Sequence, residues 1–218
     1  MIIDAIVMAG GKAKRLGLEK PLVKLGDKFL IDYILDTLKE CKKIRDIYIL
    51  TSKYTEKTGE YLKKLGYKVF LSSGEDFVKD YIEVVKKLNL KDFLLIACDL
   101  TFLKASTLER AIDLYFKIKK DSLILVVKCE DLIALGVKVD YTIKGDFSPI
   151  GANILNGEKI EEAYLREEIM ILDDPIEGIN IDTKEDIKLA RKILKVYFWK
   201  GLRKVEGFKV RDQDSILK

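Results

Sequence analysis

Apolar positions along this chain follow two alternating patterns. Short continuous apolar runs predict buried strands, whereas apolar residues three or four positions apart predict helices with one buried face. Up to residue 128 the two patterns alternate: the predicted strands are residues 2–8, 47–50, 68–71, 93–98 and 123–127, and the predicted helices are residues 30–41, 56–65, 77–88 and 105–118. This alternation is typical of an α/β fold with a mostly parallel sheet and helices on both faces. Ligands of such sheets bind at the carboxyl ends of the strands.

The pattern changes after residue 128. Residues 137–143 alternate apolar and polar side chains with a period of two, which predicts a half-exposed antiparallel strand. Residues 148–154 are expected to return to the sheet after a turn at residues 144–146. The sequence therefore predicts an antiparallel element over residues 137–156.

Residues 167–172 predict a further strand, and residues 184–195 predict a helix. Either Asp182 or Thr183 is expected to cap this helix, with Asp186 as the acid of a capping box. We predict one domain over residues 1–195.

Residues 196–218 form a C-terminal extension that contains three adjacent aromatic residues, Tyr197, Phe198 and Trp199. This extension either packs on the domain as a continued helix or provides a surface for a second copy of the chain or an anionic partner. A homodimer is thus one of the open alternatives.

The composition narrows the class of protein. The chain has 218 residues, of which 48% are hydrophobic and 35% charged, as expected for a globular domain with a full core. Its net charge of +4 gives no argument for nucleic acid over a small anionic substrate, and we expect no nucleic-acid partner. Lys and Glu are abundant, a bias that suits a thermophile.

Cysteine and histidine usage excludes several kinds of site. The three cysteines, Cys41, Cys98 and Cys129, are widely spaced and odd in number, so they predict neither a zinc site nor a disulfide framework. There is no histidine, which excludes histidine-based acid/base or triad chemistry. Because no secretory signal or bilayer-length apolar run is visible, we expect a cytoplasmic protein.

A basic, glycine-containing loop follows the first predicted strand. Gly10 and Gly11 come directly after Ala9, and the basic residues that follow are Lys12, Lys14, Arg15 and Lys20. Glycines allow backbone N–H groups to approach a ligand closely, and successive N–H groups form an anion-binding concavity. The loop therefore predicts a polyphosphate site, although it matches neither the P-loop pattern nor the dinucleotide fingerprint. The alternative is a glycine turn with solvated basic residues.

The segment from Gly10 to Pro21 resembles the G-G-x-[GSA]-x-R-[ML]-x-x-x-K-P loop of nucleotidyltransferases, which move a nucleoside monophosphate from an NTP onto a phosphorylated acceptor. Ala13 stands where many sugar-nucleotide enzymes have glycine, which disfavours them slightly. The resemblance implies that backbone N–H groups around Gly10 and Gly11 hold the triphosphate. It also implies that Arg15 meets the β- and γ-phosphates and that Lys20 lies between the α-phosphate and the acceptor phosphate.

Asp99 follows the apolar run 93–98 directly, at the expected carboxyl end of a strand. A carboxylate placed there, opposite a phosphate loop, is suited to hold Mg²⁺. The alternative is a helix cap or a turn residue. In nucleotidyltransferases a second metal ligand comes from a late Asn or Asp; Asn180 is the first candidate here and Asp182 the second.

Small residues at other strand ends are candidates for binding the nucleotide. Thr51 and Ser52 end one predicted strand, and Ser72, Ser73 and Gly74 follow another, where a base and ribose would lie. The alternative is ordinary turn chemistry. Gly151 would allow close approach of a ligand to the backbone, or would mark a bulge.

A narrower resemblance joins several of these pieces. The loop, Asp99-Leu100 and the segments 19–22, 30–33, 149–153, 167–170 and 180–183 together resemble the archaeal adenosylcobinamide-phosphate guanylyltransferases. That family has a Rossmann-like nucleotidyltransferase fold and moves GMP from GTP onto adenosylcobinamide phosphate, releasing pyrophosphate. The resemblance implies GTP as substrate, Mg²⁺ as cofactor and adenosylcobinamide phosphate as acceptor. It covers residues 1–195, and it departs from the family at Asp182, where a second Asn is usual.

Three alternatives stay open. The molybdenum-cofactor guanylyltransferases share the loop type, but their aspartate is commonly followed by a proline-containing stretch that is absent after Asp99. A sugar-phosphate nucleotidyltransferase is the second alternative. A nucleotide-binding regulator without catalytic activity is the third, and the presence of Arg15, Lys20 and Asp99 argues against it.

Overall fold

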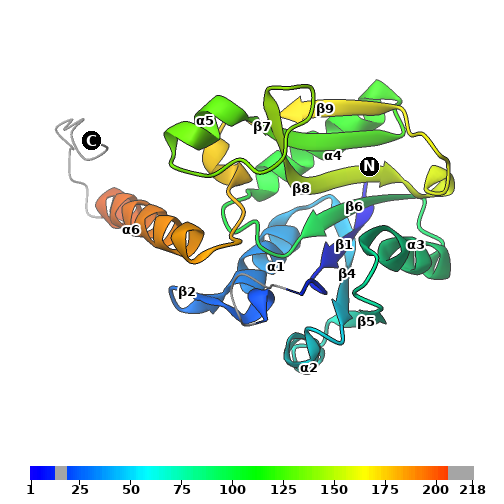
Figure 1. Ribbon diagram of the computed structural model, residues 1–218, viewed down its shortest axis with the longest axis horizontal. Helices are drawn as coiled ribbons and strands as arrows, with labels where there is room; N and C mark the ends of the chain where they lie inside the picture. The colour runs from blue at the N-terminus through cyan, green and yellow to red at the C-terminus, as the bar shows by residue number, and fades with distance from the viewer. Residues whose placement is uncertain (13–18, 206–218) are drawn as a thin grey trace.

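The computed structural model describes residues 1–12 and 19–205, and the side chains of these residues up to 196. Arg15 and most of the C-terminal extension therefore lie outside the described residues. A seven-stranded sheet in the order β5-β4-β1-β6-β8-β7-β9 forms the centre of the molecule (Figure 1). Its strands are β1 (Ile3–Met8), β4 (Ile44–Ser52), β5 (Lys68–Ser72), β6 (Asp92–Ala97), β7 (Ser122–Lys128), β8 (Phe147–Asn156) and β9 (Glu167–Ile171).

The sheet has a parallel half and a mixed half. β5, β4, β1 and β6 are parallel, β8 runs antiparallel to both β6 and β7, and β9 is parallel to β7. The carboxyl ends of the four parallel strands consequently meet at one edge of the sheet, where the loops after them lie side by side. The predicted α/β fold with a mostly parallel sheet and an antiparallel element is confirmed.

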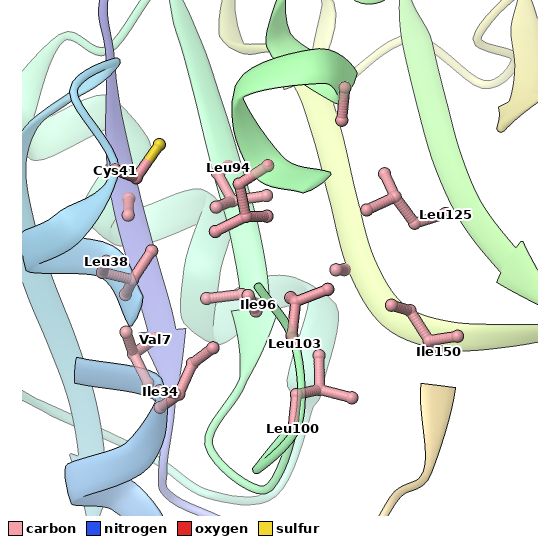
Figure 2. Close-up of a cluster of buried hydrophobic side chains, with 14 of the residues drawn as sticks. Val7, Ile34, Leu38, Cys41, Leu94, Ile96, Leu100, Leu103, Leu125 and Ile150 are labelled. Carbon is pink, nitrogen blue, oxygen red and sulfur yellow. The ribbon is translucent and has the colours of Figure 1, made fainter. Parts of the chain in front are cut away.

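Helices cover both faces, as predicted. They are α1 (Leu30–Glu40), α2 (Glu56–Lys64), α3 (Phe77–Leu88), α4 (Ala105–Ile118), α5 (Cys129–Ala134) and α6 (Lys184–Val205), with short 3₁₀ turns at η1 (Lys20–Leu22), η2 (Gly157–Lys159) and η3 (Pro175–Gly178). The largest core cluster lies between one face of the sheet and α1 and α4; Figure 2 shows Val7, Ile34 and Leu94 within it. A second cluster joins α3 to the opposite face through Val84 and Val85.

A third, smaller cluster joins an early segment of the chain, residues 23–30, to a late one around residues 181–194. It joins the hairpin of β2 (Lys24–Leu25) and β3 (Lys28–Phe29) to the segment before α6 and to α6 itself. Leu25 and Ile181 are both fully buried in it, and α6 lies beside the hairpin in Figure 1. This packing fixes the position of Lys20 relative to residues 180–183.

One predicted strand is wrong. Residues 137–142 form no strand, and Ile143 makes only an isolated bridge to Phe147 across a turn. The alternation does reflect burial, because Val137 and Val139 pack against the main core. The segment cannot pair with β8, the strand that it leads into, because both edges of β8 are already taken by β6 and β7.

The end of the chain follows the prediction in part. Thr183 and Asp186 form the expected capping box: Thr183 N–H donates to Asp186 at 2.7 Å and Asp186 N–H donates to Thr183 Oγ1 at 3.1 Å. Helix α6 continues past residue 195 to Val205. Within residues 1–12 and 19–205, the helices are too short or too polar to span a lipid bilayer.

Candidate active site

The ammonium group of Lys20 lies between two carboxylates from distant parts of the chain. Its Nζ is 2.5 Å from Asp99 Oδ2 and 2.7 Å from Asp182 Oδ1. Lys20 stands at the start of η1, Asp99 directly after β6, and Asp182 just before α6. Burial opposes the charge on Lys20, but the nearby carboxylates of Asp99 and Asp182 outweigh it and raise the pKa of the lysine above its ordinary value. Lys20 is therefore a fixed positive charge at the sheet edge.

Asp99 is buried, with 3% of its surface exposed. Its Oδ2 also accepts a hydrogen bond from Ile181 N–H at 3.2 Å, which ties the end of β6 to the late segment. The alternative of a helix cap is wrong, because Lys104 occupies the N-cap position of α4 and its N–H donates to Glu177 instead. Asp99 thus presents a carboxylate to Lys20 and to the space beside it.

Asn180 stands two positions before Asp182 and carries a further side-chain oxygen. Its Oδ1 is buried and has no hydrogen-bond partner among the described residues. A buried, unpaired amide oxygen costs free energy unless a ligand satisfies it. Thr183 provides the cap of α6, so Asp182 is free of that role and pairs with Lys20.

The carboxylates of Asp99 and Asp182 are oxygen donors of the kind that Mg²⁺ prefers, and Asn180, two positions before Asp182, has a buried unpaired amide oxygen. Mg²⁺ prefers oxygen ligands and is commonly held by one or two protein groups together with substrate phosphates. Because Asp99 and Asp182 contact the same ammonium group, their carboxylates are close together. The described residues contain no group of three or more acidic or cysteine side chains that could hold a metal without a substrate. Two neighbouring carboxylates suit a metal ion that is held by phosphate groups as well as by the protein.

The cysteine beside Asp99 is a poor candidate for a nucleophile. Cys98 is buried, and burial, with a smaller effect of the Asp99 carboxylate, raises the pKa of its thiol to about 12. A thiol with that pKa is protonated at neutral pH and is a poor nucleophile.

The glycine loop lies beside the end of β4. Ala9 N–H donates to Leu50 carbonyl at 2.8 Å, and Ser52 Oγ donates to Gly10 carbonyl at 2.6 Å. A side chain at Gly10 would lie 3.3 Å from Ser52 Cβ, whereas one at Gly11 would meet no atom within 4 Å. Gly10 is thus needed for close packing, and Gly11 faces open space.

The basic residue after the glycines pairs with a second loop. Lys12 Nζ lies 2.6 Å from Glu75 Oε2, and Glu75 also accepts from Tyr54 and pairs with Lys53. Hydrogen bonds from Lys12, Tyr54 and Lys53 lower the pKa of the Glu75 carboxyl to about 2. Lys12 is exposed, so a phosphate group can compete with Glu75 for it.

The candidate base-binding residues lie where predicted, but most of their hydroxyl groups hold the loops in place. Thr51 and Ser52 are buried, and Thr51 Oγ1 donates weakly to Phe70 carbonyl. Ser73 Oγ and the N–H groups of Ser73 and Gly74 all donate to the buried carboxylate of Asp80.

Gly74 lets the β5–α3 loop lie against the end of β4. It has a φ of +70°, and a side chain there would lie 2.6 Å from Ser52 Cβ. Only glycine accepts both the conformation and the contact.

Gly151 lies on β8 next to the end of β6. Its φ is +83°, and a side chain there would lie 3.2 Å from Ala97 Cβ. The β7–β8 register shifts between Ile124 and Val126, opposite this glycine. Gly151 therefore lies in a bulge, as one of the two interpretations expected, and close approach of a ligand to it stays a prediction.

Two carboxylates of this region were missed in the sequence. Glu75 follows Ser73 and Gly74 in the loop between β5 and α3, and Glu19 directly precedes Lys20 and Pro21. Neither carries a local signal, because their partners come from other elements.

Comparisons with known proteins identify the family of this chain. The model of the MobA-like NTP transferase domain matches residues 5–134. The adenosylcobinamide-phosphate guanylyltransferase of Methanocaldococcus jannaschii is 36% identical over 88% of this chain and 98% of its own length. A probable molybdenum cofactor guanylyltransferase of the same organism is 29% identical over 60% of this chain and 66% of its own.

Solved structures show the same fold. The molybdopterin-guanine dinucleotide biosynthesis protein A of Archaeoglobus fulgidus superposes with a TM-score of 0.64 at 20% identity, covering 89% of this chain and 100% of that one. A family match over more than half of the chain, together with a relative that aligns over nearly its full length, shows that the chain belongs to the MobA-like NTP transferase family and is a nucleotidyltransferase.

Proposed function

We propose that this protein moves GMP from GTP onto adenosylcobinamide phosphate and releases pyrophosphate. The observation that carries the proposal is the relative of that name, which is 36% identical over 88% of this chain, combined with the meeting of Lys20, Asp99 and Asp182 at the sheet edge. The relative aligns over 98% of its own length, so both halves of the sheet are included.

The reaction needs no protein nucleophile, and the chain lacks histidine. The acceptor phosphate attacks the α-phosphorus of GTP in line, a bond to the acceptor oxygen forms, and the bond to pyrophosphate breaks. Catalysis then depends on positioning and on stabilising the charge that develops on the phosphoryl oxygens. Lys20 is suited to this task because its pKa is raised and its ammonium group is held in place.

We assign the triphosphate to the backbone N–H groups around Gly10 and Gly11, with Lys12 exchanging Glu75 for a phosphate. Arg15 lies outside the described residues, and its contact with the β- and γ-phosphates stays a prediction. The residues that would hold Mg²⁺ are Asp99, Asp182 and Asn180, and the ion would supply positive charge against the phosphates.

We place the guanine beside the ends of β4 and β5. With Thr51 and Ser52 buried, and with the N–H groups of Ser73 and Gly74 donating to Asp80, the exposed carboxylate of Glu75 is better placed to read a base. A carboxylate can accept hydrogen bonds from the N1–H and amino groups of guanine, and adenine offers no such pair. This supports GTP as the nucleotide.

Labelled GTP and Mg²⁺ supplied with adenosylcobinamide phosphate, molybdopterin and sugar 1-phosphates in parallel test the proposal. Transfer of label to the cobinamide alone supports it, and transfer to molybdopterin or a sugar phosphate in its place would reassign the acceptor. If pyrophosphate were released but none of these acceptors received the label, only the general nucleotidyltransferase activity of the family would remain assigned. The cytoplasmic location, the thermophilic origin and the dimer contact stay predictions.

A further inference from the structure

The first turn of α2 has no cap from its own N-terminal residue. Thr55 occupies the N-cap position, but its side chain makes no cap hydrogen bond. Its Oγ1 instead accepts from Ser52 N–H at 3.0 Å. An N-cap side chain normally accepts from the second or third N–H group of a helix, which here belong to Lys57 and Thr58.

Glu19 supplies the missing cap from a distant part of the chain. Its Oε1 accepts from Lys57 N–H at 3.1 Å, and its Oε2 accepts from Thr58 N–H and Thr58 Oγ1, both at 2.7 Å. Thr58 is fully buried, so these hydrogen bonds are shielded from water on one side. A negative charge at a helix N-terminus is also favoured by the helix dipole.

This contact fixes the backbone that carries Lys20. The carbonyl of Glu19 accepts from Leu22 N–H at 3.0 Å, and the carbonyl of Lys20 accepts from Val23 N–H at 3.1 Å. Pro21 is buried directly after them. The main chain around Lys20 is therefore held on one side by α2 and on the other by the turn η1.

We propose that Glu19 is a positioning residue for the transfer reaction: by capping α2 it sets the place from which Lys20 reaches the reacting phosphates. A lysine side chain is long and flexible, so the position of its backbone decides where its ammonium group can reach. A displacement of about 1 Å of a charge donor can cost roughly 10²-fold in rate. The inference rests on the proposed function for the chemistry, but the contact itself is independent of it.

The kinetic test compares Glu19→Ala with Glu19→Gln. We expect Glu19→Ala to lower kcat about 10-fold. The KM for GTP should change less than about twofold, because the variant keeps the backbone N–H groups around Gly10 and Gly11 that we assign to the triphosphate. Glu19→Gln keeps the length and one acceptor oxygen, so it should recover part of the loss. Equal kcat in Glu19→Ala and the unmodified protein would overturn the proposal.

A double-mutant cycle separates positioning from general damage. In the Lys20→Ala background, the further change Glu19→Ala should leave kcat unchanged, because Glu19 acts through Lys20. An additional 10-fold loss in that background would show that Glu19 acts through the whole fold and would refute the positioning role.

A substrate-free measurement keeps the test separate from the proposed function. Acetylation by acetic anhydride, followed by mass spectrometry, reports the accessibility of each lysine. Lys20 should react several-fold faster in Glu19→Ala than in the unmodified protein, and Lys28, paired with Asp36, should not change. An unchanged Lys20 rate would contradict the proposal even if no acceptor were accepted by the enzyme.

Asp32→Ala is the matched control. Asp32 also accepts a backbone N–H, from Phe29 at 2.9 Å, and joins α1 to α2 through Tyr61 at 2.9 Å. Asp32 lies on α1, and its hydrogen bonds go to Phe29 and to Tyr61 of α2 rather than to residues 19–22. Loss of thermal stability without loss of kcat is expected there; an equal loss of kcat in both variants would mean that any weakening of α2 suffices, and would overturn the specific role of Glu19.

Discussion

The change Asp99→Asn tests the centre of the site, because it removes one charge and alters the shape of the side chain very little. The carboxylate is 3% exposed and lies 2.5 Å from Lys20 Nζ. Removing one partner of a buried ion pair typically costs about 3–5 kcal/mol, because the other charge is left without compensation. Lys20 keeps Asp182 and its side chain is 18% exposed, so we expect a lower cost of about 2 kcal/mol in the free energy of unfolding.

The expected loss of activity is much larger than this loss of stability can explain. Domains of this kind have about 5–15 kcal/mol of stability, so a loss of about 2 kcal/mol leaves well over 90% of the protein folded at 25 °C. Removal of a preorganised charged group from a site of this kind costs about 10²–10³ in kcat. If Asp99 holds the metal, the variant should also need more Mg²⁺ to reach half of its maximal rate.

The assay is a Mg²⁺ titration of the initial rate, paired with urea unfolding of the same samples. Asp121→Asn is the matched control, because Asp121 is equally buried and paired with Arg166 at 2.7 Å and Lys159 at 3.1 Å, but lies at the start of β7, away from the carboxyl edge. It should lose stability and keep its turnover. An unchanged rate and Mg²⁺ midpoint in Asp99→Asn would make Asp99 structural, and a similar loss of turnover in both variants would attribute the effect to stability alone.

Three further outcomes are expected. Lys20→Ala should lower turnover by roughly 10²–10³ while weakening GTP binding far less, as measured by calorimetry and steady-state kinetics; near-normal turnover would remove Lys20 from the mechanism. Asn180→Ala should raise the Mg²⁺ requirement more mildly than Asp99→Asn, and an unaltered Mg²⁺ titration would count against Asn180 as a ligand. Tyr115 donates to Asp92 at 2.6 Å, and burial together with that carboxylate raises the pKa of its hydroxyl, so the folded state keeps a proton that the unfolded chain loses above about pH 10. Stability should fall as pH rises through that range, and Tyr115→Phe should cost about 1 kcal/mol at pH 7 but make the alkaline decline less steep in urea titrations; an identical decline in both proteins would refute the assignment.

Local patterns predicted most of the elements, because the side-chain pattern of a strand or a helix depends on neighbouring positions alone. The predicted helices 77–88 and 105–118 have the same bounds as α3 and α4. The capping box of Thr183 and Asp186 was readable for the same reason, since its two members are three residues apart. The glycine loop was also recognisable from neighbouring residues alone, because its pattern lies between Gly10 and Pro21.

Pairing partners were not readable in this way. The alternation in residues 137–143 correctly indicated half-burial of Val137 and Val139, but a strand also needs a free neighbouring edge, and β8 had none to offer. Thr51 and Ser52 were candidates for binding the nucleotide because they end a strand, but both are buried, and Gly74 packs closely against Ser52.

The sequence by itself therefore determined the order of strands and helices, the phosphate-type loop and the identity of Lys20, Asp99 and Asn180 as candidates. The tertiary structure decided which of them meet: Lys20 and Asp182 are 162 positions apart and come together because the β2–β3 hairpin packs on Ile181 and α6. It also decided the role of Glu19, whose carboxylate caps a helix that begins 37 positions later. Burial patterns are recorded in each short segment, but contacts between distant segments arise only when the whole core has formed.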